Sequence, residues 1–116
     1  VLNYCSLTMG FKKSESYRVL YLNKKNALIA DELCEGGTVD KVQIYPREIA
    51  KKAIEHSASA IILIHTHPSG DSNPSKEDIE MTKLLVAALK HLAIAVHDHI
   101  IISKHEHYSF KSNQLI

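Results

Sequence analysis

The sequence predicts an α/β protein of the α+β type, with a mixed β-sheet flanked by helices. Three observations support this prediction. Segments rich in β-branched and aromatic residues recur along the chain, two amphipathic segments separate the later ones, and a polar loop follows the most apolar segment. Neither the strict alternation of a doubly wound fold nor the many short strands of a sandwich fits this order. The 116 residues, 45% of them apolar, are expected to form one domain, 1–116.

The first half of the chain is expected to contain three strands and a helix. Residues 16–23 and 27–33 read as a hairpin, because a short polar turn joins two apolar segments. After Gly36-Gly37, residues 38–45 alternate apolar and polar side chains as a third strand does. Pro46 suits the first turn of a helix that ends near residues 56–57. Its apolar stripe consists of Ile49, Ala50, Ala53 and Ile54.

The second half is expected to begin with the strand that carries the chemistry. Residues 58–65 end in a continuous apolar run, which is typical of a strand covered on both faces. A loop rich in turn formers follows over 67–74, and Ser75 can cap a helix over 76–92. Strands at 93–103 and 108–110 complete the predicted order β-β-β-α-β-α-β-β.

Composition narrows the classes of function. Lysine and arginine total 14 against 13 acidic residues, so the net charge of +1 gives no broad field that would attract nucleic acid. Cys5 and Cys34 do not form a disulfide framework or a metal knuckle. No apolar stretch approaches the roughly 20 residues of a membrane span, so we expect a soluble cytoplasmic protein. The chain starts at Val1, so we expect it to be a fragment whose upstream domain is missing.

The most informative segment runs from residue 65 to residue 78. His65 and His67 lie at the end of the apolar strand, and Asp78 lies in the first turn of the next helix. Three protein ligands with a fourth position left to water are typical of a catalytic zinc site. The sequence therefore predicts one zinc ion per chain. Glu32, late in a strand that could lie beside residues 60–65, is the predicted general base that takes a proton from water.

Simpler explanations exist for parts of this segment. A single histidine most often has a structural role, and the Ser75 and Asp78 pair is explained by helix capping alone. It is the combination of His-x-His, proline, a glycine-containing turn and Ser-x-x-Asp that favours a metal site.

Several other charged residues have two interpretations. Asp98 and His99 interrupt an apolar strand, so they either lie beside the metal site or make structural hydrogen bonds. His105 and His107 are better explained by a solvated hairpin than by a second metal site. The last group is basic and consists of Arg47, Lys51 and Lys52. A solvated helix surface explains these residues better than a phosphate contact does.

At these residues the sequence resembles the JAMM (MPN) metalloprotease superfamily, whose pattern is an upstream glutamate, His-x-His-Pro, six residues and Ser-x-x-Asp. Within it the chain resembles the RadC family. The stretches that carry this resemblance are Asp31-Glu32, Gly37-Thr38, Tyr45-Pro46-Arg47-Glu48, His67-Pro68-Ser69-Gly70-Asp71, Asn73-Pro74-Ser75 and residues 96–102.

The resemblance implies a role for each site residue. His65, His67 and Asp78 match the zinc ligands, Glu32 the glutamate that deprotonates water, and Ser75 the serine that helps to stabilise the oxyanion. Glu35, three residues after Glu32, is the alternative base if the register is shifted. The implied fold is similar to the cytidine deaminase-like architecture. RadC proteins usually carry an upstream helix-hairpin-helix segment that contacts DNA, which this sequence lacks.

The leading functional hypothesis is a zinc-dependent hydrolase of amide, peptide or isopeptide bonds, with a peptide or protein as substrate. Two alternatives remain open. One is a DNA-repair-associated accessory domain with a structural or vestigial metal site, which contacts DNA mainly through the missing upstream segment. The other is a metal-dependent nuclease, although such enzymes often use two-metal sites rich in carboxylates.

Overall fold

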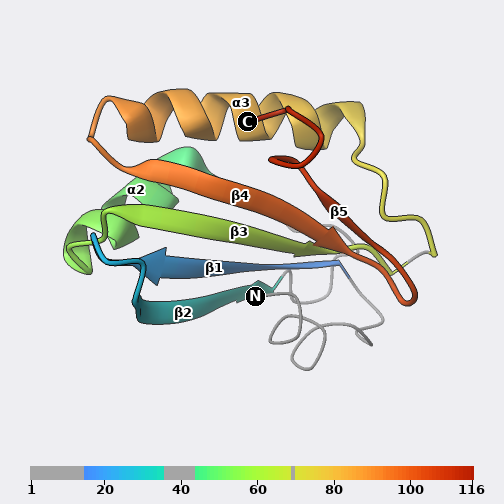
Figure 1. Ribbon diagram of the computed structural model, residues 1–116, viewed down its shortest axis with the longest axis horizontal. Coiled ribbons are helices and arrows are strands. Elements are labelled where there is room, and N and C mark those ends of the chain that lie inside the picture. The colour runs from blue at the N-terminus through green and yellow to red at the C-terminus, as the bar shows by residue number, and fades with distance from the viewer. Residues whose placement is uncertain (1–14, 36–43, 69) are drawn as a thin grey trace.

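Five strands form one mixed sheet. The computed structural model describes residues 15–35, 44–68 and 70–116. The strand order is β2-β1-β3-β4-β5, in which β3 and β4 are parallel and the other neighbours are antiparallel (Figure 1). The predicted mixed sheet is confirmed. The strands are β1 (Ser16–Leu22), β2 (Leu28–Glu35), β3 (Ala60–Thr66), β4 (Ala95–Ile102) and β5 (His107–Ser109).

The hairpin of β1 and β2 agrees with the prediction, but its position in the sheet does not. The sequence interpretation placed the second hairpin strand beside β3, whereas β1 lies between β2 and β3. Most of the expected strand at 38–45 lies outside the described residues. Its last two residues, Ile44 and Tyr45, are not in a strand, and Tyr45 precedes the first turn of a helix.

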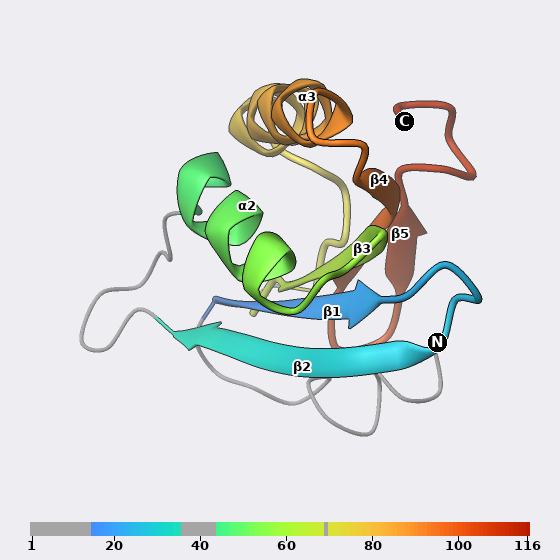
Figure 2. The ribbon, with the colours of Figure 1, turned by 90° about the vertical axis from the view of Figure 1, so that its left-hand side faces the viewer.

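Both described helices lie over the same face of the sheet (Figure 2). α2 (Pro46–Glu55) begins at the proline, where the missing N–H costs no hydrogen bond. α3 (Lys76–Lys90) begins after Ser75 and ends two residues earlier than expected, because the chain turns there and Ala93 adopts a left-handed φ of 58°. Among the described residues, neither helix has the length and apolarity needed to cross a membrane.

The sheet carries a core on each face. Every residue of β3 is buried, as its continuous apolar run predicts. The side chains of Ile61 and Leu63 pack towards the helices with Leu85 and Leu89 of α3. The opposite face carries a second aliphatic cluster, which consists of Leu20, Leu22, Ala60, Ile62, Ile64, Ile100 and Ile102. His65 continues the alternation of Ile61 and Leu63, so it faces the helices.

An irregularity in β4 changes which of its residues face the helices. The register with β3 shifts after the pair Ile61 and Val96, so that the next pair is Ile62 and Asp98. One residue of β4, His97, is therefore extra. As in a β-bulge, this reverses the alternation, and His99 pairs with Leu63 on the helical side. The shift thereby places a histidine beside the end of β3 that carries His65.

Two neighbouring leucines of α3 offer a matched test of this packing. Leu85 is fully buried, whereas Leu84 is 66% exposed. We expect Leu85→Ala to lower the free energy of unfolding by about 2–5 kcal/mol, because it leaves a cavity in the core. Leu84→Ala should change it by less than about 0.5 kcal/mol. Urea unfolding of both variants measures the difference, and equal losses would contradict the placement of α3.

Candidate metal centre

The three predicted ligands meet between the end of β3 and the start of α3. One ligand atom from each of His65, His67 and Asp78 lies within 4.8 Å of the other two. His65 Nδ1 is 3.6 Å from Asp78 Oδ1, and His67 Nε2 is 3.3 Å from Asp78 Oδ2. Donor atoms around a tetrahedral zinc lie roughly 3.3–3.6 Å apart when each bond is about 2.0–2.2 Å. The described part of the chain therefore contains a group that can hold a metal ion.

Hydrogen bonds orient His67 for this role. Its backbone N–H donates to the carbonyl of Ile102 at 2.9 Å, which ties the start of the loop to β4. Its Nδ1 is 3.1 Å from the carbonyl oxygen of Asp71. Because a carbonyl only accepts, the neutral ring carries its proton on Nδ1 and presents the Nε2 lone pair to Asp78.

His65 is oriented by a carboxylate that the sequence analysis did not single out. Its Nε2 is 2.6 Å from Glu15 Oε1, so Nε2–H donates to Glu15. The other nitrogen, Nδ1, is buried and has no hydrogen-bond partner among the described residues. A buried unpaired lone pair is costly, and metal-bound histidines typically donate their second N–H to a carboxylate. The vacant Nδ1 beside Asp78 therefore fits a metal ion.

Asp78 is both a helix cap and a candidate ligand. Its Oδ2 accepts the backbone N–H of Ser75 at 2.9 Å, and its own N–H donates to Ser75 Oγ at 3.0 Å. This reciprocal pair is a capping box. Burial alone would raise the pKa of Asp78, but the hydrogen bonds from His67 and Ser75 and the charge of His65 lower it well below the usual range. The capping and ligand interpretations are thus compatible.

The same contacts act on His67 in the opposite direction. Its hydrogen bond with Asp78 raises the pKa of the imidazole, against the effect of burial and with help from the Asp71 carbonyl. Without a metal ion, a proton on His67 therefore stabilises the pair that it forms with Asp78. His67 and Asp78 thereby share a proton, whose place a bound cation could take.

Tyr17 packs against two of the three ligands. Its ring stacks on His65 with a centroid distance of 3.9 Å, and its hydroxyl donates to Asp78 Oδ1 at 3.4 Å. Burial raises the pKa of Tyr17, and the negative charges of Asp78 and Glu15 add to this effect. The phenol therefore stays protonated and acts as a hydrogen-bond donor at the edge of the site.

His99 lies behind the ligands and is fully buried. Thr82 donates its hydroxyl proton to the carbonyl of Asp78 at 2.7 Å, so it accepts the Nδ1–H of His99, also at 2.7 Å. His99 thereby supports the first turn of α3. Asp98 has a structural role instead: its carboxylate accepts the N–H of Lys111 and the hydroxyl of Ser109.

The structure does not bring Glu32 to the metal group. Glu32 pairs with Val19 on the edge strand β2, so β1 separates it from β3. Its carboxylate lies 3.2 Å from His56 Nε2 and 3.9 Å from Lys52 Nζ, near the end of α2. Glu35 pairs in the backbone with Ser16, and its side chain lies outside the described part of the chain. The structure thus separates Glu32 from the candidate ligands by one strand.

Glu15 is a carboxylate that does reach the metal group, through its contact with His65. It directly precedes β1, and the pairing of Ser16 with Thr66 puts the start of β1 beside the end of β3. The signal in the sequence is an acidic residue immediately before a strand. That signal becomes informative only when β1 is known to be the neighbour of β3.

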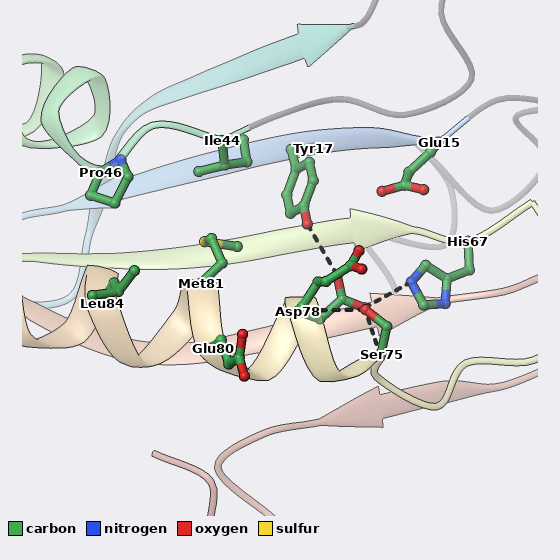
Figure 3. Close-up of a pocket in the computed structure, with 11 residues that line it drawn as sticks. Glu15, Tyr17, Ile44, Pro46, His67, Ser75, Asp78, Glu80, Met81 and Leu84 are labelled. Atoms are coloured by element: carbon green, nitrogen blue, oxygen red, sulfur yellow. Dashed lines mark hydrogen bonds and ion pairs between the residues drawn. The ribbon is translucent and has the colours of Figure 1, made fainter.

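An open cavity of about 650 Å³ lies beside the metal group. Figure 3 shows His67, Ser75 and Asp78 at one end and Pro46 and Leu84 at the other. Glu15 and Tyr17 also line it, so Glu15 shares one space with two of the candidate ligands, His67 and Asp78. Glu32, His105 and His107 are absent from its described lining. A substrate could reach the ligands through this cavity.

Comparison with known families gives one match. A family model described as "RadC-like JAB domain" matches residues 1–115. The matched range covers nearly the whole chain and includes the three candidate ligands, Ser75, Glu15 and Glu32. The family resemblance seen in the sequence motifs is confirmed.

The buried His99 predicts a pH-dependent stability. Burial lowers its pKa from 6.5 to about 3, and the nearby charge of His65 adds to the effect. Between these values the unfolded chain binds a proton that the folded chain does not. The free energy of unfolding of the metal-free protein should therefore fall as the pH drops from 6.5 towards 3, by up to about 1.4 kcal/mol per pH unit.

His99→Asn tests this assignment, because asparagine offers an N–H donor near Nδ1 but does not titrate. The variant should be less stable at pH 7, and its stability should change less between pH 7 and pH 4. Urea unfolding across this range gives both slopes. Equal slopes would show that another group controls the acid sensitivity.

Proposed function

The chain belongs to the RadC-like JAB domain family, and on this premise we propose that it is a zinc-dependent hydrolase of peptide or isopeptide (amide) bonds. The observation that carries the proposal is the grouping of His65, His67 and Asp78 beside the carboxylate of Glu15 in an open cavity. Two imidazoles and one carboxylate form a ligand set that suits zinc and leaves a position for water. Within the described residues, no cysteine joins the group, as a structural zinc site would commonly require.

Zinc bound by these three residues would polarise a carbonyl and lower the pKa of water from 15.7 to roughly 7. The protein must supply the proton transfer. Glu15 Oε1 accepts the N–H of His65, and its second oxygen remains available to take a proton from water and pass it to the leaving nitrogen. We therefore assign the role of base to Glu15 in place of Glu32.

Ser75 is proposed to assist at the carbonyl oxygen. Its hydroxyl accepts the N–H of Asp78, so the hydroxyl proton is directed elsewhere and can donate. Ser75 lines the cavity beside Asp78 (Figure 3). A donor in this position could stabilise the negative charge that develops on a carbonyl oxygen under attack.

The charge of the cavity favours an amide over a phosphodiester. Its described lining includes four carboxylates, those of Glu15, Glu77, Asp78 and Glu80, and no lysine or arginine. A nucleic acid brings one negative charge per phosphate, and proteins that bind it neutralise that charge with basic residues. The nuclease alternative is therefore disfavoured. The DNA-associated accessory domain would gain no contact from this surface either.

Zinc content is the first test. We expect the protein prepared with zinc to retain about one ion per chain after dialysis, measured by inductively coupled plasma mass spectrometry. His67→Ala should lose most of it. His107→Ala is the matched control, since His107 lies on β5 outside the metal group and should leave the zinc content unchanged. Retention of zinc by His67→Ala would refute the assignment of the site.

The two glutamates provide the second test. Glu15→Gln should lower any amide hydrolysis by about 10²–10⁴-fold, the usual contribution of a general base. Glu32→Gln should leave the rate close to that of the wild type, because its partners lie at the end of α2. A screen of peptide and isopeptide substrates with zinc-loaded protein measures both.

The opposite pattern, with Glu32→Gln inactive and Glu15→Gln active, would restore Glu32 as the base. If wild-type protein that contains one zinc hydrolyses none of these substrates, the accessory-domain hypothesis becomes the better account.

A further inference from the structure

The cavity extends well beyond the metal group, and this outer part has a chemistry of its own. Figure 3 shows it running from Asp78 along α3 towards the start of α2. Four apolar residues line this part: Ile44, Pro46, Met81 and Leu84. Leu84 is 66% exposed, so much of its side chain is accessible to a bound molecule. The wall therefore offers apolar surface to a bound molecule.

Acidic side chains border this apolar wall. Glu77, Glu80 and Leu84 follow one another at spacings of three and four residues, so they lie along one side of α3. Glu80 lines the cavity but belongs to neither the ligand group nor the contacts of Glu15. A ligand that covers the apolar surface and brings positive charge to Glu80 would match this wall.

We propose that this outer wall, formed by Ile44, Pro46, Glu77, Glu80, Met81 and Leu84, receives a lysine or arginine side chain of a polypeptide substrate. The inference rests on the proposed hydrolase function. Long basic side chains bury their aliphatic stems against apolar surface while the charged end remains near water. Here the stem lies along Met81 and Leu84, and the charged end lies beside Glu80.

The distance along α3 places the basic residue relative to the bond that is cleaved. Leu84 lies six residues after Asp78, which corresponds to about 9 Å along the helix axis. An extended polypeptide spans about 3.3 Å per residue. The basic side chain therefore belongs to a residue within about three positions of the scissile amide.

Other occupants match the wall less well. A purely apolar side chain would cover the leucine and methionine but would take water from Glu77 and Glu80 without replacing it. An acidic peptide or a nucleic acid strand would place negative charge against these carboxylates. A polyamine would supply charge but no amide next to the metal group. A basic polypeptide can cover the apolar residues, place positive charge beside the carboxylates and bring an amide next to the metal group.

Binding, measured without turnover, tests the inference. The probes are fluorescein-labelled hexapeptides in which alanine alternates with lysine, norleucine or glutamate. Fluorescence anisotropy with zinc-loaded protein that carries Glu15→Gln, and therefore hydrolyses slowly, gives each Kd. Norleucine has an aliphatic stem of similar length without the charge. We expect the lysine peptide to bind more tightly than the norleucine peptide, by roughly two- to fivefold for each partly exposed ion pair formed.

Three variants assign that preference to the wall. Glu80→Gln should reduce the preference for lysine over norleucine, and the double variant Glu77→Gln/Glu80→Gln should abolish it. Leu84→Asn should weaken both peptides. Glu48→Gln is the matched control, since Glu48 is an exposed residue of α2 outside the lining, and it should change neither Kd.

Each result is decisive for one of the two proposals. Equal binding of the lysine and norleucine peptides, a preference that persists in the double variant, or no binding of any peptide would overturn the assignment of the wall. Binding with the expected preference but no hydrolysis of basic peptides would support the wall and count against the hydrolase. Hydrolysis with no preference for basic residues would overturn the wall and leave the hydrolase intact.

Discussion

The buried carboxylate of Asp78 is the constraint on which the site depends. A carboxylate that is 8% exposed requires hydrogen bonds or positive charge on each oxygen. Here one oxygen faces Ser75 and His67, and the other faces Tyr17 and His65. These partners come from β1, the end of β3, the loop after it and the cap of α3. Satisfying a single charge thus joins β1 to the segment that runs from the end of β3 to the start of α3.

The sheet determines which side chains can reach that charge. Tyr17 and His65 face the helices because they are opposite one another on neighbouring strands. The extra residue at His97 brings His99 to the same face, where its contact with Thr82 supports the turn that carries Asp78. A regular β4 would instead have put Asp98 on this face. The bulge therefore directs His99 towards the metal group and leaves Asp98 to make structural hydrogen bonds with Ser109 and Lys111.

The sequence was most informative where the site is local. His65, His67, Ser75 and Asp78 lie within fourteen residues, and one strand, one loop and one helix start bring them together. The element types of β1, β2, α2, β3 and α3 could be read in the same way, from periodicity, Pro46 and Ser75.

The failures concern pairing between distant segments. Glu32 was chosen because its strand could lie beside β3, but strand order is decided by packing across the whole sheet. Glu15 was overlooked for the same reason. The roles of Asp98 and His99 depended on a register shift that leaves no mark in the alternation of residues. The contribution of Asp78 to both cap and site shows that a simple structural explanation does not exclude a functional one.

The hydrogen bond between His67 and Asp78 has a consequence for how the domain responds to its surroundings. Because this contact raises the pKa of His67, a metal ion that takes the Nε2 lone pair must displace a proton that the pair favours. Binding of the metal ion and release of the proton from His67 are therefore one coupled equilibrium. A fall in pH and a fall in the free metal ion concentration both favour the metal-free site. Each site that loses its ion then binds a proton.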